Sequence, residues 1–425
     1  MSKALEVWID CDLVPMKLVG MLHHDKGQVR FHYAESWLKS PEAFALDPQL
    51  SLDKSPFYPN AEEGNFGIFL DSSPDRWGQT LMKRREALQA KDEGKVPANL
   101  YAWDFLIGVQ DATRQGALRF RMPGTETFLG DMPLAAPPVT SLRELQDVAY
   151  ELTNKSINDL GALRRWLAVL VAPGASLGGA RPKANFTETD GSMWIAKFPA
   201  RDDERDYGAW EYLTHTLAAR AGIDVPPARA VQITKPYKTF MVKRFDRSGD
   251  RRRFYASALT LLGRPNSEGA SYLEIAQRLM SNGSHANRDL EQLYRRVAFN
   301  VMVGNRDDHL RNHGFILDAG GWRLSPAFDV NPNIDKEEHV LAIDDKDPRP
   351  LVETVLDTHA FYQLDATRAR EIVLEIAAVV GSWRELALGT GISRADIELY
   401  EAAFSAHTAF MTEAPVQKMA SRRRP

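Results

Sequence analysis

The chain has 425 residues, more than one ordinary hydrophobic core holds, so we expect two or three subdomains. Its 44% hydrophobic and 26% charged residues are typical of a soluble globular protein, and a net charge of -4 excludes a global attraction to nucleic acid or membrane. A single cysteine, Cys11, excludes an internal disulfide and a thiolate metal cluster and suits a reducing cytoplasm. Asp10 and Asp12 stand where a signal peptide needs apolar residues, and no apolar run is long enough to span a membrane.

The first segment, which we place at residues 1–123, mixes strand and helix signals. Residues 5–9 and 28–33 alternate between apolar and polar side chains, as half-buried strands do. Farther along, Ser73 is expected to cap a helix, with Pro74 in the first turn. These signals predict an α/β subdomain.

A linker and a helix are expected next, at residues 124–155. Positions 122–140 are rich in proline and glycine, which is typical of a linker. Ser141 and Glu144 have the spacing of a capping box, so we expect a helix from there to about Asn154.

Residues 156–247 combine a glycine-containing loop with strands, and residues 248–425 are mainly helical. A small β-rich lobe followed by a helical lobe is the order of a two-lobed kinase. The fold class we expect is therefore α+β: a two-lobed protein-kinase-like fold with an extra N-terminal α/β subdomain and a mainly helical C-lobe. The expected elements are a loop at 172–183, strands at 184–186 and 193–198, a helix at 207–221, a strand at 239–245, a hairpin at 314–325, and helices at 365–381 and 393–410.

The strongest chemical signal is an ordered set of three polar residues. Asp307 and Asn312 have the spacing D-x-x-x-x-N, the predicted hairpin follows, and Asp329 comes directly after Phe328. A kinase needs one carboxylate to orient the accepting hydroxyl, and an amide and a second carboxylate to hold Mg²⁺ on the phosphates of ATP. Mg²⁺ prefers oxygen ligands and keeps several waters, so two protein ligands suffice. We assign Asp307 the catalytic role, and we assign Asn312 and Asp329 as the ligands of Mg²⁺.

Two alternatives to this interpretation stay open. The stretch around Asp307 has the composition of a calcium loop or of a solvated charged turn. Asp308 is the rival of Asp307 for the catalytic role. His309 is expected to be structural, because only His313 stands at a metal-ligand spacing from it and no cysteine is near.

The segment SLGGARPK, from Ser176 to Lys183, is a candidate phosphate-binding loop. Gly178 and Gly179 would let backbone N–H groups approach phosphate oxygens, and Lys183 would add a positive charge. The spacing differs from that of a Walker loop, and an ordinary surface turn is the alternative.

Lys197 lies on a predicted strand among apolar neighbours, where a lysine is costly unless it meets an anion. The α- and β-phosphates of ATP would serve, with Glu211 on the following helix as the partner of the lysine. The alternatives are an edge-strand lysine that limits aggregation and a solvated helix carboxylate. Backbone groups from Val242 to Phe245, at the end of the next strand, are expected to contact adenine.

With these residues identified, the chain resembles the HipA family of bacterial serine/threonine kinases, the toxin half of HipA–HipB toxin–antitoxin modules. The resemblance covers most of the chain in the order of the family. Its stretches are residues 65–76, 111–120 (DATRQGALRF), 175–183, 243–247 (KRFDR), 304–315 and 324–329.

The resemblance implies further roles. Ser176 matches the serine that family members autophosphorylate, which ejects the loop and silences the kinase. Lys243 and Phe245 match hinge positions near adenine. Two departures from ordinary protein kinases fit this family: no HRD triplet is present, since Asn305 and Arg306 precede Asp307, and no glycine follows the metal aspartate.

The family also implies partners and a location. The expected partners are a HipB-like helix-turn-helix antitoxin, operator DNA bound through the antitoxin complex, and a protein substrate such as an aminoacyl-tRNA synthetase, all in the cytoplasm and without a membrane. The Arg-rich tail at 421–425 has no family counterpart that we can place.

Three hypotheses stay open at this stage. The first is an ATP- and Mg²⁺-dependent protein serine kinase that acts as a toxin. The second is a small-molecule kinase on a related fold, against which Ser176 and the N-terminal segment argue. The third is a non-catalytic partner that binds an antitoxin and DNA, against which the intact set of Lys197, Asp307, Asn312 and Asp329 argues.

Overall fold

The structure is a computed structural model that describes residues 3–60, 62–131, 136–154, 159–169, 179 and 181–412. Ser176, Gly178 and the Arg-rich tail lie outside the described residues. The chain divides into two compact units, each described by itself. The first unit comprises Met1–Glu204, Val231–Pro265 and Phe315–Ala319, and the second comprises Arg205–Ala230, Asn266–Gly314 and Gly320–Pro425.

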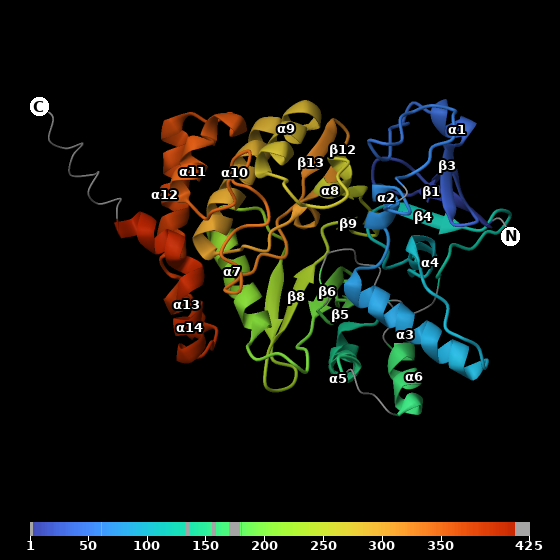
Figure 1. The fold of residues 1–425 in the computed structure, drawn as a ribbon, viewed down its shortest axis with the longest axis horizontal. Coiled ribbons are helices and arrows are strands. Elements are labelled where there is room, and N and C mark those ends of the chain that lie inside the picture. The colour runs from blue at the N-terminus through green and yellow to red at the C-terminus, as the bar shows by residue number, and fades with distance from the viewer. Residues whose placement is uncertain are drawn as a thin grey trace, which may run out of the picture. The chain divides into compact units, whose positions relative to one another are not determined.

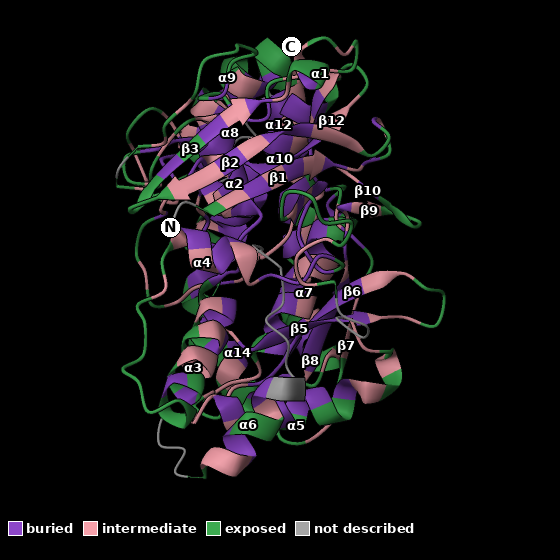
Figure 2. Ribbon diagram, turned by 90° about the vertical axis from the view of Figure 1, so that its right-hand side faces the viewer, coloured by how far each residue is buried: buried purple, intermediate pink, exposed green. Residues whose placement is uncertain are grey.

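An antiparallel sheet begins the first unit, with the strand order β3-β2-β1-β4 (Figure 1). Burial alternates along β1 and β3, as the sequence predicted, so one face packs into the core and Figure 2 shows the other partly exposed. The second strand was not among the predicted elements. The strands are β1 (Lys3–Ile9), β2 (Lys17–Asp25), β3 (Gln28–Tyr33) and β4 (Leu118–Arg121).

Four helices accompany this sheet, and one begins later than predicted. Asp75, not Ser73, caps α3, because the Asp75 carboxylate accepts from the backbone N–H of Gly78 at 2.8 Å. The Ser73 hydroxyl instead donates to the carbonyl of Phe69, inside the preceding helix. The helices are α1 (Glu35–Leu38), α2 (Gly67–Asp71), α3 (Arg76–Asp92) and α4 (Ala102–Ile107).

A second sheet carries the predicted strands of the glycine-loop region. Its members in the first unit are β5 (Lys183–Thr187), β6 (Met193–Lys197) and β8 (Thr239–Lys243), all antiparallel. One sheet face packs on a core that includes α3, α5 (Leu142–Leu152) and α6 (Leu160–Val169). The predicted helix start at α5 is confirmed, but the capping box is wrong: Ser141 ends a short turn, η1 (Val139–Ser141), and makes no capping hydrogen bond.

The remaining strands of the first unit return the chain toward α2. The carboxylate of Asp71, in α2, accepts from both the backbone N–H and the hydroxyl of Ser257, at 2.7 and 2.8 Å. The elements are β9 (Arg247–Ser248), β10 (Arg251–Arg252), β11 (Tyr255–Ser257), α8 (Ala258–Leu261) and most of β12 (Gly314–Asp318).

The second unit is mainly helical, as predicted, and α10 (Ala286–Val303) runs through its core. This helix packs against α9 and α12 (Figure 1), and most of its residues from Leu290 onward are buried. The other elements are α7 (Tyr207–Arg220), β7 (Ala228–Val231), α9 (Tyr272–Asn282), η2 (Leu310–Asn312), β13 (Gly321–Leu324), α11 (Val352–Asp357), η3 (His359–Tyr362), α12 (Ala366–Val380), α13 (Trp383–Gly389), α14 (Arg394–Tyr400) and η4 (Glu401–Phe404).

The architecture is mixed α/β, in agreement with the coarse prediction. The strand–turn–strand order after Asn312 is confirmed by β12 and β13, which a two-residue turn separates. The four predicted domain boundaries stay predictions. Across the part of the chain that is described, no helix is both long and apolar enough to cross a membrane.

Candidate active site

The candidate catalytic loop begins where α10 ends. Gly304 adopts a left-handed conformation, with φ of +66°, and terminates the helix. A Cβ atom at this position would lie 2.3 Å from the carbonyl oxygen of Ala403, so only glycine fits both the backbone angle and the space. This turn directs the chain into the segment that carries Asp307.

Asp307 is accessible. Its side chain is 61% exposed, and the carboxylate forms an ion pair with the ammonium group of Lys336. The backbone of Lys336 is tied to the same loop, since its carbonyl accepts from the guanidinium of Arg306 at 2.7 Å. A carboxylate in this position is open to an incoming hydroxyl group.

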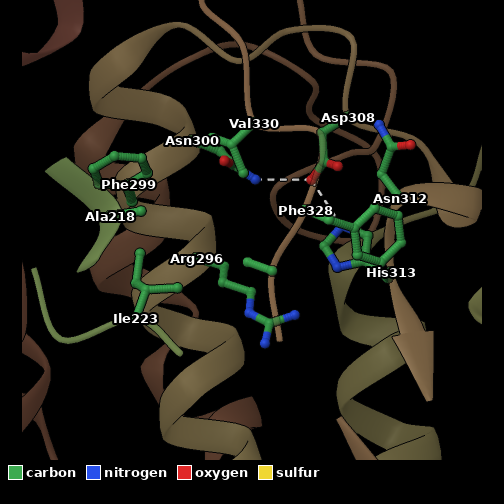
Figure 3. Close-up of a pocket in the computed structure, with 11 residues that line it drawn as sticks. Ala218, Ile223, Arg296, Phe299, Asn300, Asp308, Asn312, His313, Phe328 and Val330 are labelled. Atoms are coloured by element: carbon green, nitrogen blue, oxygen red, sulfur yellow. Dashed lines mark hydrogen bonds and ion pairs between the residues drawn. The ribbon is translucent and has the colours of Figure 1, made fainter. Parts of the chain in front are cut away.

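Asp308, the rival carboxylate, is buried, with its side chain 4% exposed. One of its oxygens accepts from the hydroxyl of Tyr272 at 2.6 Å. The same oxygen accepts from the amide of Asn300 at 2.8 Å and the Nε2 of His313 at 2.7 Å (Figure 3). Burial opposes ionisation, but the charge and hydrogen bonds of its partners, His313 first among them, hold the pKa of Asp308 below its usual value. The environment of Asp308 therefore favours a structural role, and Asp307 is the accessible carboxylate of the two.

Asn312 lies close to the segment that carries Asp329 in the second unit. Asn312 is only 5% exposed, yet its Oδ1 has no hydrogen-bond partner among the described residues. It lines a small pocket together with Phe328 and Val330, the two neighbours of Asp329 (Figure 3). Asp329 itself is half-buried and has a φ of +57°, an uncommon conformation for a residue with a side chain.

These oxygens fit the predicted metal. A buried amide oxygen without a partner is costly, and a cation would satisfy it. Mg²⁺ prefers hard oxygen donors and needs few protein ligands when phosphates supply the rest. No cluster of three or more histidine, cysteine, aspartate or glutamate side chains arranged for a metal occurs among the described residues.

In the first unit, Lys183 of β5 and Lys197 of β6 are direct cross-strand partners, and both are buried. Like charges opposite each other destabilise a sheet, so this pair needs negative charge nearby. Asp75 supplies it to Lys183 through a buried ion pair of 2.5 Å. The ammonium of Lys197 lies 5.9 Å from the centre of the Phe240 ring.

Helix α3 holds the chain on both sides of the segment 170–182. Before the segment, the guanidinium of Arg85 donates to the carbonyl of Leu167 at 2.8 Å. After it, Asp75 pairs with Lys183, and the indole N–H of Trp77 donates to the Lys183 carbonyl at 3.1 Å. Contacts with α3 and its capping residue Asp75 therefore lie on both sides of this segment.

Comparisons with known proteins found two family models that match the chain. A model of the HipA N-terminal domain matches residues 6–99, and a model of the HipA-like C-terminal domain matches residues 175–383. The chain belongs to the HipA family. The C-terminal match includes Lys197, Asp307, Asn312 and Asp329.

Individual relatives are distant. The chain is 25% identical over 356 residues to "Putative kinase Y4mE" of Sinorhizobium fredii, covering 77% of each chain. It is 23% identical over 224 residues to a "Putative kinase" of Haemophilus influenzae, covering 46% of this chain and 65% of the relative. The HipA chain of the Shewanella oneidensis HipA, HipB and operator DNA complex has a similar fold, with a TM-score of 0.67 at 18% identity over 95% of this chain and 96% of that one.

The other residues that the sequence analysis assigned to the nucleotide site occupy varied places. Gly179 is exposed, with φ of +93°, and Glu211 is buried on α7 in the second unit. Lys243 lies 4.0 Å from the carboxylate of exposed Asp190, and the half-buried Phe245 ring lies 6.0 Å from that of Tyr255. The nucleotide roles of all four, and of Lys183, stay predictions.

Sequence reasoning missed a buried ionic cluster between two stretches of the HipA resemblance. Arg244 and Asp246, from KRFDR, form an ion pair of 2.6 Å, and Asp246 also accepts from the backbone N–H of Gly116 in DATRQGALRF. Each stretch mixes acidic and basic residues, which was the only signal that they pair. The remaining members are Arg247, which pairs with Asp246, and Arg119 and Arg252, which pair with Asp111.

Proposed function

We propose that this HipA-family chain is an ATP- and Mg²⁺-dependent serine/threonine protein kinase. The observation that carries the proposal is the contrast within one loop. Asp307 is accessible and its neighbour Asp308 is buried, while Asn312, beside the segment of Asp329, presents a buried oxygen that has no partner in the described part of the chain. Relatives named as putative kinases and the match to a HipA-like C-terminal domain support it.

Each residue has a defined task in this proposal. ATP with Mg²⁺ supplies the phosphoryl group. Asp307 orients the hydroxyl of a serine or threonine and accepts its proton, while Asn312 and Asp329 hold the metal through their oxygens. Lys197, which is buried opposite Lys183, would neutralise phosphate charge. The acceptor oxygen would form a bond to the γ-phosphorus of ATP while the bond to the bridging oxygen of the β-phosphate breaks, so that ADP leaves and Asp307 accepts the hydroxyl proton.

The family context extends the proposal to regulation and partners. Ser176 is proposed as the site of autophosphorylation. About -1.5 to -2 added charges in the loop would then repel the nucleotide phosphates and stop transfer. The Shewanella oneidensis protein was solved with HipB and operator DNA, and we propose a HipB-like antitoxin and operator DNA as partners here. A translation component such as an aminoacyl-tRNA synthetase is the proposed substrate.

The test is incubation of the purified full chain with ATP, with and without Mg²⁺, followed by mass spectrometry of its peptides. We expect phosphate on Ser176 only when Mg²⁺ is present and Asp307 is intact. Asp307→Asn should prevent it, whereas Asp345→Asn, at an exposed aspartate of the same unit, should not. A thermal shift with Mg²⁺–ATP provides an independent measure of nucleotide binding. Absence of both labelling and a shift, in protein that is unphosphorylated at the start, would refute the kinase assignment.

A further inference from the structure

The two ends of the candidate catalytic loop are tied together beneath it. Asp308 follows the proposed catalytic residue Asp307, and His313 follows the proposed metal ligand Asn312. The side chains of Asp308 and His313 are buried, and Nε2 of His313 lies 2.7 Å from the Asp308 carboxylate. Because each is adjacent in the chain to a proposed functional residue, the distance between them limits the distance between Asp307 and Asn312.

Side chains from two helices, α9 and α10, also bind Asp308. Tyr272, the first residue of α9, and Asn300, in the last turns of α10, donate to the same Asp308 oxygen at 2.6 and 2.8 Å. The rings of Tyr272 and His313 also meet edge to face, with centres 5.6 Å apart. Figure 3 shows Asp308 between Asn300 and His313 with both bonds drawn. All four side chains are buried, so water does not compete for these bonds.

The same network reaches the segment that carries Asp329. The amide of Asn305 donates to the Oδ1 of Asn300 at 3.1 Å, and the Asn305 Oδ1 accepts from the backbone N–H of Asn331 at 3.4 Å. The Asn331 amide in turn lies 3.4 Å from the carboxylate of Asp329. Hydrogen bonds therefore connect the surroundings of all three proposed functional positions within one unit.

We infer that Asp308, His313, Tyr272 and Asn300 form a positioning clamp for the candidate active site. The clamp touches neither substrate nor metal. It fixes the spacing of Asp307 and Asn312 and, through Asn305 and Asn331, the placement of Asp329. This inference rests on the proposed function for its catalytic consequences, but the ordering of the loop can be measured without it.

The variant His313→Leu removes one donor and leaves the buried charge of Asp308 less well compensated. We expect kcat for phosphate transfer to fall about 10- to 100-fold, as when the partners of metal ligands are removed, with a weaker apparent affinity for Mn²⁺ measured by electron paramagnetic resonance. His313→Gln, which retains an N–H donor, should restore most of both. Amide hydrogen exchange of residues 305–314 should be faster in His313→Leu and near the wild-type rate in His313→Gln.

The matched control is His407→Leu. His407 is also buried in the second unit and makes one hydrogen bond, from Nε2 to the carbonyl of Ala377 at 2.8 Å, outside the clamp. This variant should lose stability without a change in kcat, Mn²⁺ affinity or loop exchange. Tyr272→Phe, which deletes one hydroxyl and preserves the ring, provides a milder probe if His313→Leu does not fold.

The outcomes separate the clamp from the kinase assignment. If the wild type binds no Mn²⁺–ATP and transfers no phosphate, the proposed function fails, and hydrogen exchange alone decides the clamp. The clamp is refuted if folded His313→Leu, or Tyr272→Phe in its place, shows wild-type exchange in residues 305–314. It is also refuted if His407→Leu reproduces the same kinetic loss.

Discussion

Two regions of the molecule are rich in charged and amide groups. One is the buried cluster around Asp246 in the first unit, and the other is the loop from Asp307 to Asn312 in the second. In the cluster, both oxygens of Asp246 accept hydrogen bonds, from Arg244, Arg247 and the backbone of Gly116. In the loop, the Asp307 carboxylate is mostly exposed, and the Asn312 oxygen accepts no bond from the described residues. Both regions belong to stretches that resemble the same family.

The difference separates polar groups that stabilise from polar groups that can bind. Acceptors that are already satisfied contribute to stability and have nothing left to offer a ligand. A buried acceptor without a partner costs stability that a bound ligand can restore, and an exposed acceptor is hydrated and open to a ligand. The two regions should therefore respond to substitution in opposite ways, and the following variants test whether they do.

The largest effect is expected on catalysis at Asp307. Asp307→Asn should reduce the rate of phosphate transfer by about 10²- to 10⁴-fold, because the amide cannot accept the hydroxyl proton. Its free energy of unfolding should stay within about 0.5 kcal/mol of the wild type, since the side chain is exposed. Transfer rates and urea unfolding of the same preparations measure both quantities. If Asp308→Asn folded normally and lost transfer while Asp307→Asn kept it, the two aspartates would exchange roles.

Stability should respond most at Asp246. Asp246→Asn leaves Arg244 and Arg247 without their buried counter-charge and should lower the free energy of unfolding by about 3–5 kcal/mol. Burial opposes its ionisation, but Arg244 and Arg247 hold the pKa of Asp246 far below its usual value. A carboxyl group with a lowered pKa stabilises above its unfolded pKa of about 4 and loses this contribution as the pH falls further. Urea unfolding at pH 7 is the measurement, with Asp190→Asn as the exposed control. A loss below about 1 kcal/mol would show that the cluster is not stabilising.

A smaller, pH-dependent effect is expected at His339, which is buried in the second unit. Burial lowers the pKa of His339 to about 4, so the unfolded chain binds this proton at a higher pH than the folded one. The free energy of unfolding is therefore not reduced by His339 above about pH 6.5, and it falls by about 3 kcal/mol as the pH drops to about 4. His339→Leu should remove this part of the pH dependence. The comparison of unfolding curves for both proteins at pH 7 and pH 4.5 measures it, and parallel losses in the two would contradict the assignment.

The smallest effect is expected for Lys336→Ala. Lys336 pairs with Asp307, but both side chains are exposed, at 41% and 61%, so water and salt screen the interaction. The free energy of unfolding should change by less than about 1 kcal/mol, and the difference should vanish at high ionic strength. Urea unfolding at low and high NaCl concentration measures it. A change above about 2 kcal/mol would mean that this part of the loop is stabilised like the Asp246 cluster.

Local patterns predicted much of the fold. Alternation of apolar and polar residues predicted β1 and β3, and the helix predicted at 207–221 is α7 (Tyr207–Arg220). Competition between neighbouring residues was harder to resolve. Ser73 and Asp75 are both good helix caps, and the choice depends on α2, whose carbonyl at Phe69 accepts the Ser73 hydroxyl. That information lies in the folded structure and not in the local sequence.

The candidate site was predicted by residue type and spacing, but its environments were not. Nothing in the order Asp307–Asp308 indicates that the first side chain is exposed and the second is buried against two helices. Likewise, the partner of Lys183 lies 108 positions earlier in the chain, beyond the reach of any local pattern. Long-range pairings of buried charges are the part of this protein that required a structure.

The buried pairs of the N-terminal segment also govern when it can fold during synthesis. The partner of Asp75 is Lys183, that of Asp111 is Arg252 and that of Asp71 is Ser257. These partners are synthesised 108, 141 and 186 residues later. Until those residues leave the ribosome, the emerging segment would have to bury carboxylates without their partners, which is unfavourable. We therefore expect the first 123 residues to remain incompletely folded on the ribosome, and the same segment expressed as a fragment to lack a cooperative unfolding transition.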